Sequence, residues 1–332
     1  MAYPRSTYTT ARALTYSYIH IPPKLPNTQY ILFLHGFPST AHDWRHQISF
    51  FATKGYGILA PDLLGFGETS RPNELEMYSG KGMAGDIVEI MVSEGVGVVV
   101  GVAHDWGSFL LSRLANYHPE RFSAYVFIDH GYGAPGNGLT TATVQQINSS
   151  TQTSLGFSIF GYFLFFDEED APNLLDDHSE SVESLFFTAD DEINKKYKGA
   201  PGGFRTWLAE GRTADVPAYR TSEDRQRYQH AFSVQKGGYG PATNWYRASL
   251  RGINEDDEKE IPTPAHTLTH PTLLIASTGY FITVTVDFPA IMRPLVPDLR
   301  VETVHGGHWL QLERADEVNG ILEAFVQEKR PV

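Results

Sequence analysis

Short apolar runs alternate with amphipathic stretches in the first part of the chain. Residues 30–34 and 57–60 are apolar and stop at Gly or Pro, which is typical of a buried strand that meets a loop. Residues 82–95 carry apolar positions at helical spacing. Residues 97–103 are apolar throughout, which favours a strand covered on both faces of a parallel sheet. Strands that alternate with helices predict an α/β domain with a mostly parallel sheet.

Four further segments extend this pattern. Residues 12–21 alternate loosely and predict an edge strand, and residues 123–128 predict another strand. A strand-like run returns at residues 272–276, and a final helix is expected over residues 316–328. The sheet is therefore expected to draw on both ends of the chain.

The middle of the chain has a different texture. Residues 134–262 lack the strand–helix rhythm and are rich in aromatic and acidic residues. The segment from Asp167 to Glu192 has eleven acidic residues and no Lys or Arg, which we interpret as a solvated helical face. We therefore predict an α/β core of residues 1–133 and 263–332, interrupted by a helical cap domain of residues 134–262.

Composition narrows the classes of function. The 332 residues include 26 Lys and Arg against 39 Asp and Glu, and this acidic balance argues against nucleic acid or a membrane as partner. There is no cysteine, which excludes disulfides, thiolate chemistry and cysteine-bound metals. No apolar run approaches the roughly 20 residues of a spanning helix, and the first residues lack the apolar region of a signal peptide. We expect a cytoplasmic protein, and a homo-oligomer is compatible with the sequence.

The stretch His104-Asp105-Trp106-Gly107 carries the clearest chemical signal. Small residues flank a central residue where a predicted strand turns into a helix, which is the pattern of a nucleophile elbow. A carboxylate at that position suits attack on an sp³ carbon, giving an alkyl ester that water can cleave. The alternative interpretation is that Asp105 is only a helix N-cap.

Two further motifs favour the catalytic interpretation. His35-Gly36-Phe37-Pro38 follows an early strand, where an α/β-hydrolase places an oxyanion-hole loop. Gly307-His308-Trp309 puts a histidine after the nucleophile and before the last helix, the order expected of a triad on this fold. His104 and His305 lie near these motifs but do not occupy the position of the base.

Together these motifs resemble the epoxide hydrolases of the α/β-hydrolase superfamily, particularly the soluble fungal and microbial type, over about residues 16–325. HGFP at 35–38, PDLLGFGETSRP at 61–72 and HDWG at 104–107 are specific for the branch that also contains haloalkane dehalogenases. The stretch Asn244-Trp245-Tyr246-Arg247 resembles a cap motif of the epoxide hydrolases. A dehalogenase more usually has Asn in place of Phe37, so epoxide hydrolase is the better match and haloalkane dehalogenase the alternative.

The resemblance implies a role for each motif residue. Asp105 attacks an epoxide carbon while the hydroxyls of Tyr162 and Tyr246 stabilise the alkoxide. His308 then activates water to cleave the ester and release a vicinal diol. The backbone N–H groups of Phe37 and Trp106 form the oxyanion hole. The resemblance implies no metal or organic cofactor, and the partners are a small epoxide and water.

The acid that pairs with the catalytic histidine departs from the family pattern. Most relatives place it in the loop after the strand at residues 272–276, where this chain has Tyr280. Asp129 ends the strand at residues 123–128, a position that some haloalkane dehalogenases use for this acid, and it is our preferred candidate. The alternatives are that Asp129 only caps a turn or that the second half-reaction is weakened. Asp287 ranks lower because it lies in an expected helix. The missing acid also leaves open a ligand-binding or isomerase-like protein that kept the scaffold.

Overall fold

The computed structural model describes residues 3–25 and 28–328. The chain divides into two compact units. Unit 1 comprises Met1–Ser70, Gly80–Gly136 and Asp256–Val332, and unit 2 comprises Arg71–Ser79 and Asn137–Glu255. Both units are therefore assembled from segments that are distant in the sequence.

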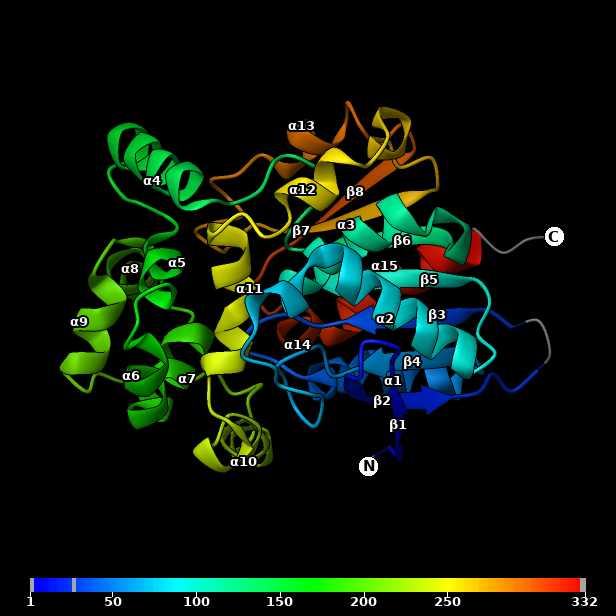
Figure 1. The fold of residues 1–332 in the computed structure, drawn as a ribbon, viewed down its shortest axis with the longest axis horizontal. Coiled ribbons are helices and arrows are strands. Elements are labelled where there is room, and N and C mark those ends of the chain that lie inside the picture. The colour runs from blue at the N-terminus through cyan, green and yellow to red at the C-terminus, as the bar shows by residue number, and fades with distance from the viewer. Residues whose placement is uncertain (1–2, 26–27, 329–332) are drawn as a thin grey trace. The chain divides into compact units, whose positions relative to one another are not determined.

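Unit 1 contains an eight-stranded sheet with the order β1-β2-β4-β3-β5-β6-β7-β8 (Figure 1). The strands from β4 to β8 pair in parallel, whereas β2 pairs antiparallel with both β1 and β4. This topology confirms the predicted α/β class with a mostly parallel sheet. The strands are β1 (Arg5–Thr9), β2 (Thr15–Ile21), β3 (Tyr30–Leu34), β4 (Gly57–Pro61), β5 (Val99–His104), β6 (Phe122–Ile128), β7 (Thr272–Ser277) and β8 (Leu299–Val304).

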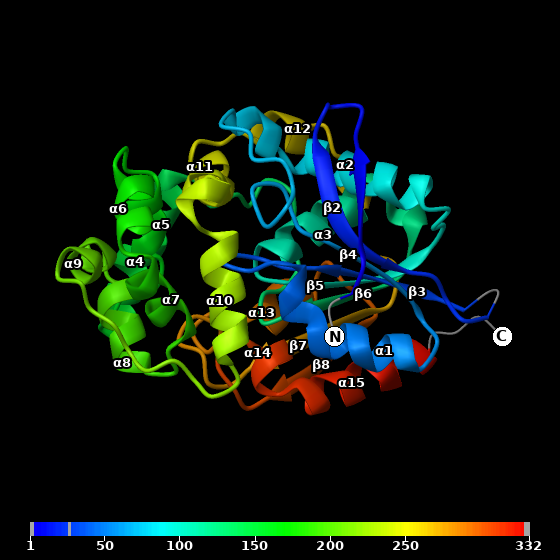
Figure 2. The same ribbon diagram turned by 90° about the horizontal axis from the view of Figure 1, so that it is seen from below.

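Helices cover both faces of this sheet. In Figure 2, α2 and α3 lie on one face, and α1 and α15 lie on the other. Apolar residues of the strands form one core with residues of α1 and α15. Phe33 of β3, Phe51 of α1 and Phe325 of α15 all belong to it. The helical segments of unit 1 are η1 (Ala41–Trp44), α1 (Arg45–Thr53), α2 (Gly80–Ser93), α3 (Trp106–Tyr117), η3 (Pro119–Arg121), α12 (Glu255–Lys259, which starts at the last residue of unit 2), η6 (Thr263–His266), α13 (Phe288–Met292), α14 (Leu310–Glu313) and α15 (Ala315–Glu328).

The predicted edge strand is wrong in one respect. Strand β2 is not an edge, because β1 pairs with it from Arg5 to Thr9 and β4 pairs on its other side. The sequence pattern did not predict β1 or β8, since each has half-buried and exposed residues in place of an apolar run. Both strands are recognisable only once a neighbouring strand is in place to pair with them.

The described part of unit 2 is built from helices (Figure 1). Its short first segment, η2, joins the helices of the long insertion through contacts with α11. The helical segments are η2 (Leu75–Tyr78), α4 (Thr141–Leu155), α5 (Gly161–Phe166), α6 (Ala171–Asp177), α7 (Ser179–Phe187), α8 (Asp191–Ile193), the π-helical η4 (Asn194–Gly199), α9 (Gly203–Ala209), α10 (Ser222–Ala231), η5 (Val234–Lys236) and α11 (Gly240–Leu250).

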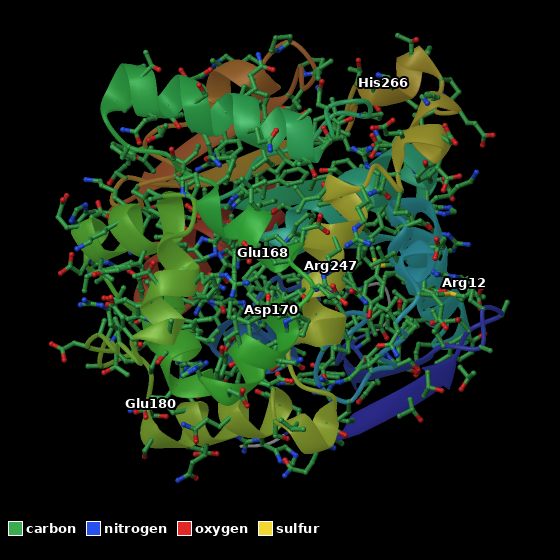
Figure 3. All side chains as sticks on the ribbon, turned by 60° about the vertical axis from the view of Figure 1, so that its left-hand side comes forward. Arg12, Glu168, Asp170, Glu180, Arg247 and His266 are labelled. Atoms are coloured by element: carbon green, nitrogen blue, oxygen red, sulfur yellow. The ribbon has the colours of Figure 1, made fainter. Side chains whose placement is uncertain are left out.

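The acidic stretch of unit 2 is only partly a solvated face. Glu168 and Asp170 bind Arg205 at the surface, and Arg247 donates to the backbone carbonyl of Glu168 at 2.9 Å (Figure 3). Glu183, in contrast, is fully buried and pairs with buried Arg220 at 2.9 Å. Burial of a charge needs such a partner, so the expectation of a uniformly exposed face is wrong at this residue.

No helix in residues 3–25 and 28–328 combines the length and the apolar character that crossing a membrane requires.

Candidate active site

Asp105 stands at the turn between β5 and α3. Its backbone has φ 54° and ψ −126°, a conformation that L-residues rarely adopt. A Cβ added at Gly107 would lie 2.2 Å from the carbonyl oxygen of Leu34, so a glycine is needed for α3 to start this close to β3. The strained turn projects the Asp105 side chain away from the helix, where its carboxylate makes no N-cap hydrogen bond with any described residue.

The Asp105 carboxylate is held between two groups. Its Oδ1 accepts a hydrogen bond of 2.8 Å from the backbone N–H of Phe37, and its Oδ2 lies 3.6 Å from Nε2 of His308. A Cβ at Gly36 would lie 2.2 Å from Oδ1, so this loop approaches the carboxylate as closely as a glycine permits. Burial raises the pKa of Asp105, but the nearby histidines and the Phe37 N–H outweigh it and lower the pKa. Asp105 is therefore an ionised carboxylate with one oxygen already hydrogen-bonded.

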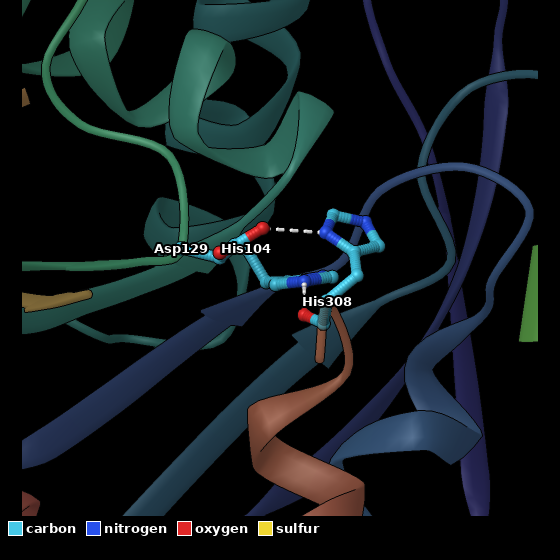
Figure 4. A group of neighbouring side chains, drawn as sticks. All are labelled: His104, Asp129 and His308. Carbon is cyan, nitrogen blue, oxygen red and sulfur yellow. Dashed lines mark hydrogen bonds and ion pairs between the residues drawn. The ribbon is translucent and has the colours of Figure 1, made fainter. Parts of the chain in front are cut away.

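The histidine expected to be the base lies beside a second carboxylate. His308 precedes α14 and is buried. Its Nδ1 donates to Oδ2 of Asp129 at 2.5 Å (Figure 4). Because this bond places the proton on Nδ1, Nε2 has its lone pair available on the side that faces Asp105. The structure thus brings Asp105, His308 and Asp129 into one row.

Asp129 occupies a tight turn at the end of β6. Its φ is 66°, and the N–H of His130 donates to the carbonyl oxygen of Ile128 at 2.8 Å, which closes a γ-turn around Asp129. The hydroxyl of Thr283 donates to the other carboxylate oxygen, Oδ1. Burial raises the pKa of Asp129, but the imidazole of His130, 3.5 Å away, and the hydrogen bond and charge of His308 outweigh it and lower the pKa. The carboxylate is fully buried and stays charged because its neighbours satisfy it.

The other two candidates for the acid lie elsewhere. Tyr280 stacks its ring on the imidazole of His308, with 4.8 Å between the ring centroids and a tilt of 34°. Asp287 caps α13, where its Oδ1 accepts a hydrogen bond from the N–H of Ala290. Tyr280 therefore supports the face of the imidazole, and Asp287 supports a helix.

The two competing histidines have structural partners. His104 is buried and its Nε2 donates to the backbone carbonyl of His308 at 2.8 Å (Figure 4). Burial and the charge of His308 lower the pKa of His104 to about 3, so it is neutral. His305 lies 3.3 Å from the hydroxyl of Thr278. Neither imidazole pairs with the carboxylate of Asp105, as Nε2 of His308 does.

His104, Asp129 and His308 also offer ligand atoms within 4.8 Å of one another, a separation that a metal ion could bridge. Nε2 of His104 and Nδ1 of His308 are, however, both engaged in hydrogen bonds, one to a carbonyl and one to Asp129. We therefore describe the cluster as a hydrogen-bonded network that orients His308.

Unit 2 brings together the two tyrosines that the sequence singled out. Tyr162 of α5 and Tyr246 of α11 are buried, and their rings are 5.8 Å apart at an angle of 71°. Tyr246 also packs edge-on against Phe166. Arg247 holds the two helices together by donating to the carbonyl oxygen of Phe166 at 2.8 Å. The NWYR segment therefore positions its tyrosine through the arginine that follows it.

The two oxyanion-hole candidates come from different segments, Phe37 from the loop after β3 and Trp106 from the start of α3. The N–H of Phe37 already binds Asp105, and Trp106 is the first residue of α3. An N–H at a helix N-terminus has no partner within the helix and favours negative charge.

Comparison with protein families agrees with this architecture. A model described as "alpha/beta hydrolase fold" matches residues 29–315. The chain belongs to the α/β-hydrolase fold family.

Several known proteins resemble the chain over most of its length. It is 28% identical over 312 residues to "Epoxide hydrolase A" of Mycobacterium tuberculosis, covering 91% of each protein. It is 26% identical over 328 residues to "Bifunctional epoxide hydrolase 2" of Sus scrofa, covering 95% of this chain and 56% of that protein. The chain thus spans only about half of the bifunctional relatives.

Solved structures show the same fold. The crystal structure of Epoxide Hydrolase A from Mycobacterium thermoresistibile has a TM-score of 0.79 and 25% identity, covering 98% of both chains. An epoxide hydrolase from an endophytic Streptomyces has a TM-score of 0.80 and 23% identity, covering 98% of this chain and 95% of the other.

Sequence reasoning missed two neighbours of Asp129. His130 directly follows Asp129 in the sequence. That its ring comes within 3.5 Å of the Asp129 carboxylate could not be predicted, because this position depends on the γ-turn. Thr283 lies 154 residues away in the sequence, and no local pattern marks it as a partner.

Proposed function

We propose that this α/β-hydrolase is an epoxide hydrolase that opens an epoxide to a vicinal diol through an ester of Asp105. The observation that carries the proposal is the row of Asp105, His308 and Asp129, in which a carboxylate replaces the serine of an acyl-transfer triad. The relatives and solved structures named above bear the name epoxide hydrolase, which supports the same reaction.

In the first step, Oδ2 of Asp105 attacks one epoxide carbon and the carbon–oxygen bond of the ring breaks. Oδ1 remains on the N–H of Phe37 and becomes the carbonyl oxygen of the ester. The leaving alkoxide is a strong base, so the step needs a donor for the developing charge. We assign this role to the hydroxyls of Tyr162 and Tyr246, because two phenols can hydrogen-bond one oxygen and supply it with a proton.

In the second step, Nε2 of His308 removes a proton from water and the water oxygen attacks the ester carbon of Asp105. The tetrahedral oxyanion forms on Oδ1, where the N–H groups of Phe37 and Trp106 stabilise it. Collapse of this intermediate breaks the ester carbon–oxygen bond, and the proton of its new hydroxyl passes to the departing oxygen, which releases the diol and restores the carboxylate. The proton on His308 returns through water to the phenolate that the first step left. Asp129 stabilises the imidazolium that forms on the way.

Unit 2 acts in this proposal as the cap that carries the two tyrosines. The cytoplasmic location, the fungal type and a homo-oligomeric state remain predictions from the sequence.

One observation favours haloalkane dehalogenase as a second candidate. Asp129 follows β6, the position that some dehalogenases use for their acid. Phe37 argues the other way, since dehalogenases usually have an asparagine there to hold the halide.

A product assay tests the proposal. The purified protein is incubated with a panel of terminal, internal and aryl epoxides, and in parallel with primary chloro- and bromoalkanes. We expect diol formation with at least one epoxide and no enzymatic halide release. Halide release without diol would favour the dehalogenase, and saturable binding of an epoxide with neither product would favour a ligand-binding protein.

A further inference from the structure

His35, a buried residue directly after β3, is a histidine that the mechanism does not use. Its Nε2 lies 3.0 Å from the backbone nitrogen of Leu63, and its Nδ1 lies 2.9 Å from the carbonyl oxygen of Gly36. Leu63 belongs to the segment after β4, which pairs with β3, so the ring bridges the ends of two neighbouring strands. Phe66 packs edge-on against the ring, with 5.1 Å between the centroids. The imidazole is therefore held at both of its nitrogens.

These two contacts decide which nitrogen of His35 carries the proton. The backbone N–H of Leu63 can only donate, so Nε2 accepts and carries no proton. Burial lowers the pKa of His35 and outweighs the charges of Asp62 and Asp43, which raise it, so the ring is neutral. The proton of the neutral ring is then on Nδ1, which donates it to the carbonyl of Gly36.

The carbonyl that His35 binds belongs to the peptide unit of the oxyanion hole. The C=O of Gly36 and the N–H of Phe37 are the two ends of one planar trans peptide, in which they point in opposite directions. His35 binds the oxygen end at 2.9 Å, and Oδ1 of Asp105 accepts from the N–H end at 2.8 Å. A hydrogen bond to the oxygen also polarises the peptide and makes its N–H a stronger donor. Both the direction and the strength of this N–H therefore depend on the imidazole.

We propose that His35 is a positioning residue that orients the Gly36–Phe37 peptide, so that its N–H stabilises the oxyanion formed on Asp105 during ester hydrolysis. The inference rests on the proposed function, because this oxyanion arises only when water attacks the ester. Gly36 has no side chain that could hold the peptide by packing, so the imidazole supplies the restraint. The contact matters less in the first step, in which the negative charge on Asp105 disappears.

Two substitutions separate the two hydrogen bonds of the ring. In His35→Asn the amide nitrogen takes the place of Nδ1 and can still donate to Gly36, but no atom accepts from Leu63. In His35→Gln the amide oxygen takes the place of Nε2 and can still accept from Leu63, but the donor to Gly36 is lost. Both variants lose the ring and one hydrogen bond, so each is the matched control for the other.

Single-turnover reactions give the rates of ester formation and ester hydrolysis separately, with the Asp105 ester followed by intact-protein mass spectrometry. His35→Gln should form the ester at a rate close to wild type and hydrolyse it about 10–100-fold more slowly, because the oxyanion donor remains but is misdirected. His35→Asn should keep most of the wild-type rate of hydrolysis. Equal rates of hydrolysis in the two variants, or a slower rate in His35→Asn, would overturn the proposal.

A second measurement, on the wild-type protein, does not depend on the reaction. Long-range ¹H–¹⁵N NMR spectra of histidine-labelled protein distinguish an imidazole protonated on Nδ1 from one protonated on Nε2. We expect the Nδ1–H form for His35, identified by its contact with the ring of Phe66. A proton on Nε2 would overturn the inference even in an active epoxide hydrolase. The Nδ1–H form in a protein that forms no diol would support the contact with Gly36 and contradict the proposed function.

Discussion

Two carboxylates follow adjacent parallel strands and face the same histidine, yet their surroundings differ. Asp129 is fully buried, whereas the side chain of Asp105 is 10% exposed. Asp105 ends β5 with one oxygen on a backbone N–H and the other 3.6 Å from His308. Asp129 ends β6 with both oxygens taken, one by Thr283 and the other by His308 at 2.5 Å.

The difference lies in how much of each carboxylate is satisfied. Asp105 keeps an oxygen that no close hydrogen bond engages, so it can form a covalent bond. Both oxygens of Asp129 accept hydrogen bonds from neighbouring side chains, so its charge is held in place and is suited to stabilise an imidazolium. The same residue type at equivalent positions of the sheet is thus suited to nucleophilic attack in one case and to electrostatic support in the other.

Removal of Asp105 should have the largest effect. Asp105→Asn and Asp105→Ala should lower diol formation by on the order of 10⁴-fold or more, because no other described group replaces the nucleophile. Both variants should stay folded by circular dichroism, since the carboxylate caps no helix. Near wild-type turnover in Asp105→Ala, or in Asp105→Asn with deamidation excluded by mass, would contradict the role of Asp105.

Removal of the charge on Asp129 should affect only the second step. Asp129→Asn should form the ester at a rate close to wild type and hydrolyse it on the order of 10³–10⁴-fold more slowly, because the imidazolium loses its counter-charge. Rapid-quench mass spectrometry should show the substrate mass persisting on the peptide that contains Asp105.

Tyr280→Phe is the matched control for this variant, since it keeps the ring that stacks on His308. It should hydrolyse the ester normally. The double variant Asp129→Asn with Tyr280→Asp should regain part of the rate, because it restores the acid at its usual position. Rapid ester hydrolysis in Asp129→Asn would show that His308 has another partner.

The tyrosines of unit 2 should affect only the first step, in which the Asp105 ester forms. Tyr246→Phe should slow ester formation about 10-fold or more and leave ester hydrolysis unchanged, because its hydroxyl acts as charge develops on the epoxide oxygen. Tyr197→Phe, whose ring packs on Trp207 in the same unit, is the control. An unchanged rate of ester formation in Tyr246→Phe would remove it from the mechanism.

The sequence marks the two carboxylates with signals of different strength. Asp105 lies in a contiguous motif, and local sterics at the elbow dictate its neighbours. Asp129 was inferred because Tyr280 occupies the usual position of the acid and because some haloalkane dehalogenases, which the chain also resembles, place their acid at the end of this strand. Thr283 and His130 were not predicted, because their contacts depend on a loop conformation and a γ-turn.

The same division holds for the fold. The central strands β3 to β7 are apolar runs and were predicted within a few residues. Strands β1 and β8 are half exposed and have no such signal. The helices of unit 2 pack mainly through aromatic residues whose spacing does not reveal their partners, so the meeting of Tyr162 with Tyr246 followed from the family resemblance and not from periodicity.

The smallest expected effect concerns stability. The pKa of Asp129 is lowered in the folded protein, so its contribution to stability is present above its unfolded pKa of about 4 and is lost as the pH falls. Asp129→Asn should therefore reduce the free energy of unfolding at neutral pH, by about 1–3 kcal/mol, and progressively less below about pH 4. Urea denaturation across the pH range measures this difference.

The exposed residue Asp256 pairs with Lys259 at the surface, and Asp256→Asn is the control for this experiment. It should change the free energy of unfolding little at any pH. A stability loss in Asp129→Asn that grows as the pH falls would have the wrong sign for a stabilised carboxylate.

A single turnover in ¹⁸O-labelled water tests the division of roles most directly. If Asp105 attacks the epoxide and the water aided by His308 attacks the ester carbonyl, the labelled oxygen enters the Asp105 carboxylate. With enzyme in excess over epoxide, peptide mass spectrometry should then find ¹⁸O on Asp105 and none in the diol. Label in the diol with unlabelled Asp105 would mean that water attacks the epoxide directly and would contradict the account.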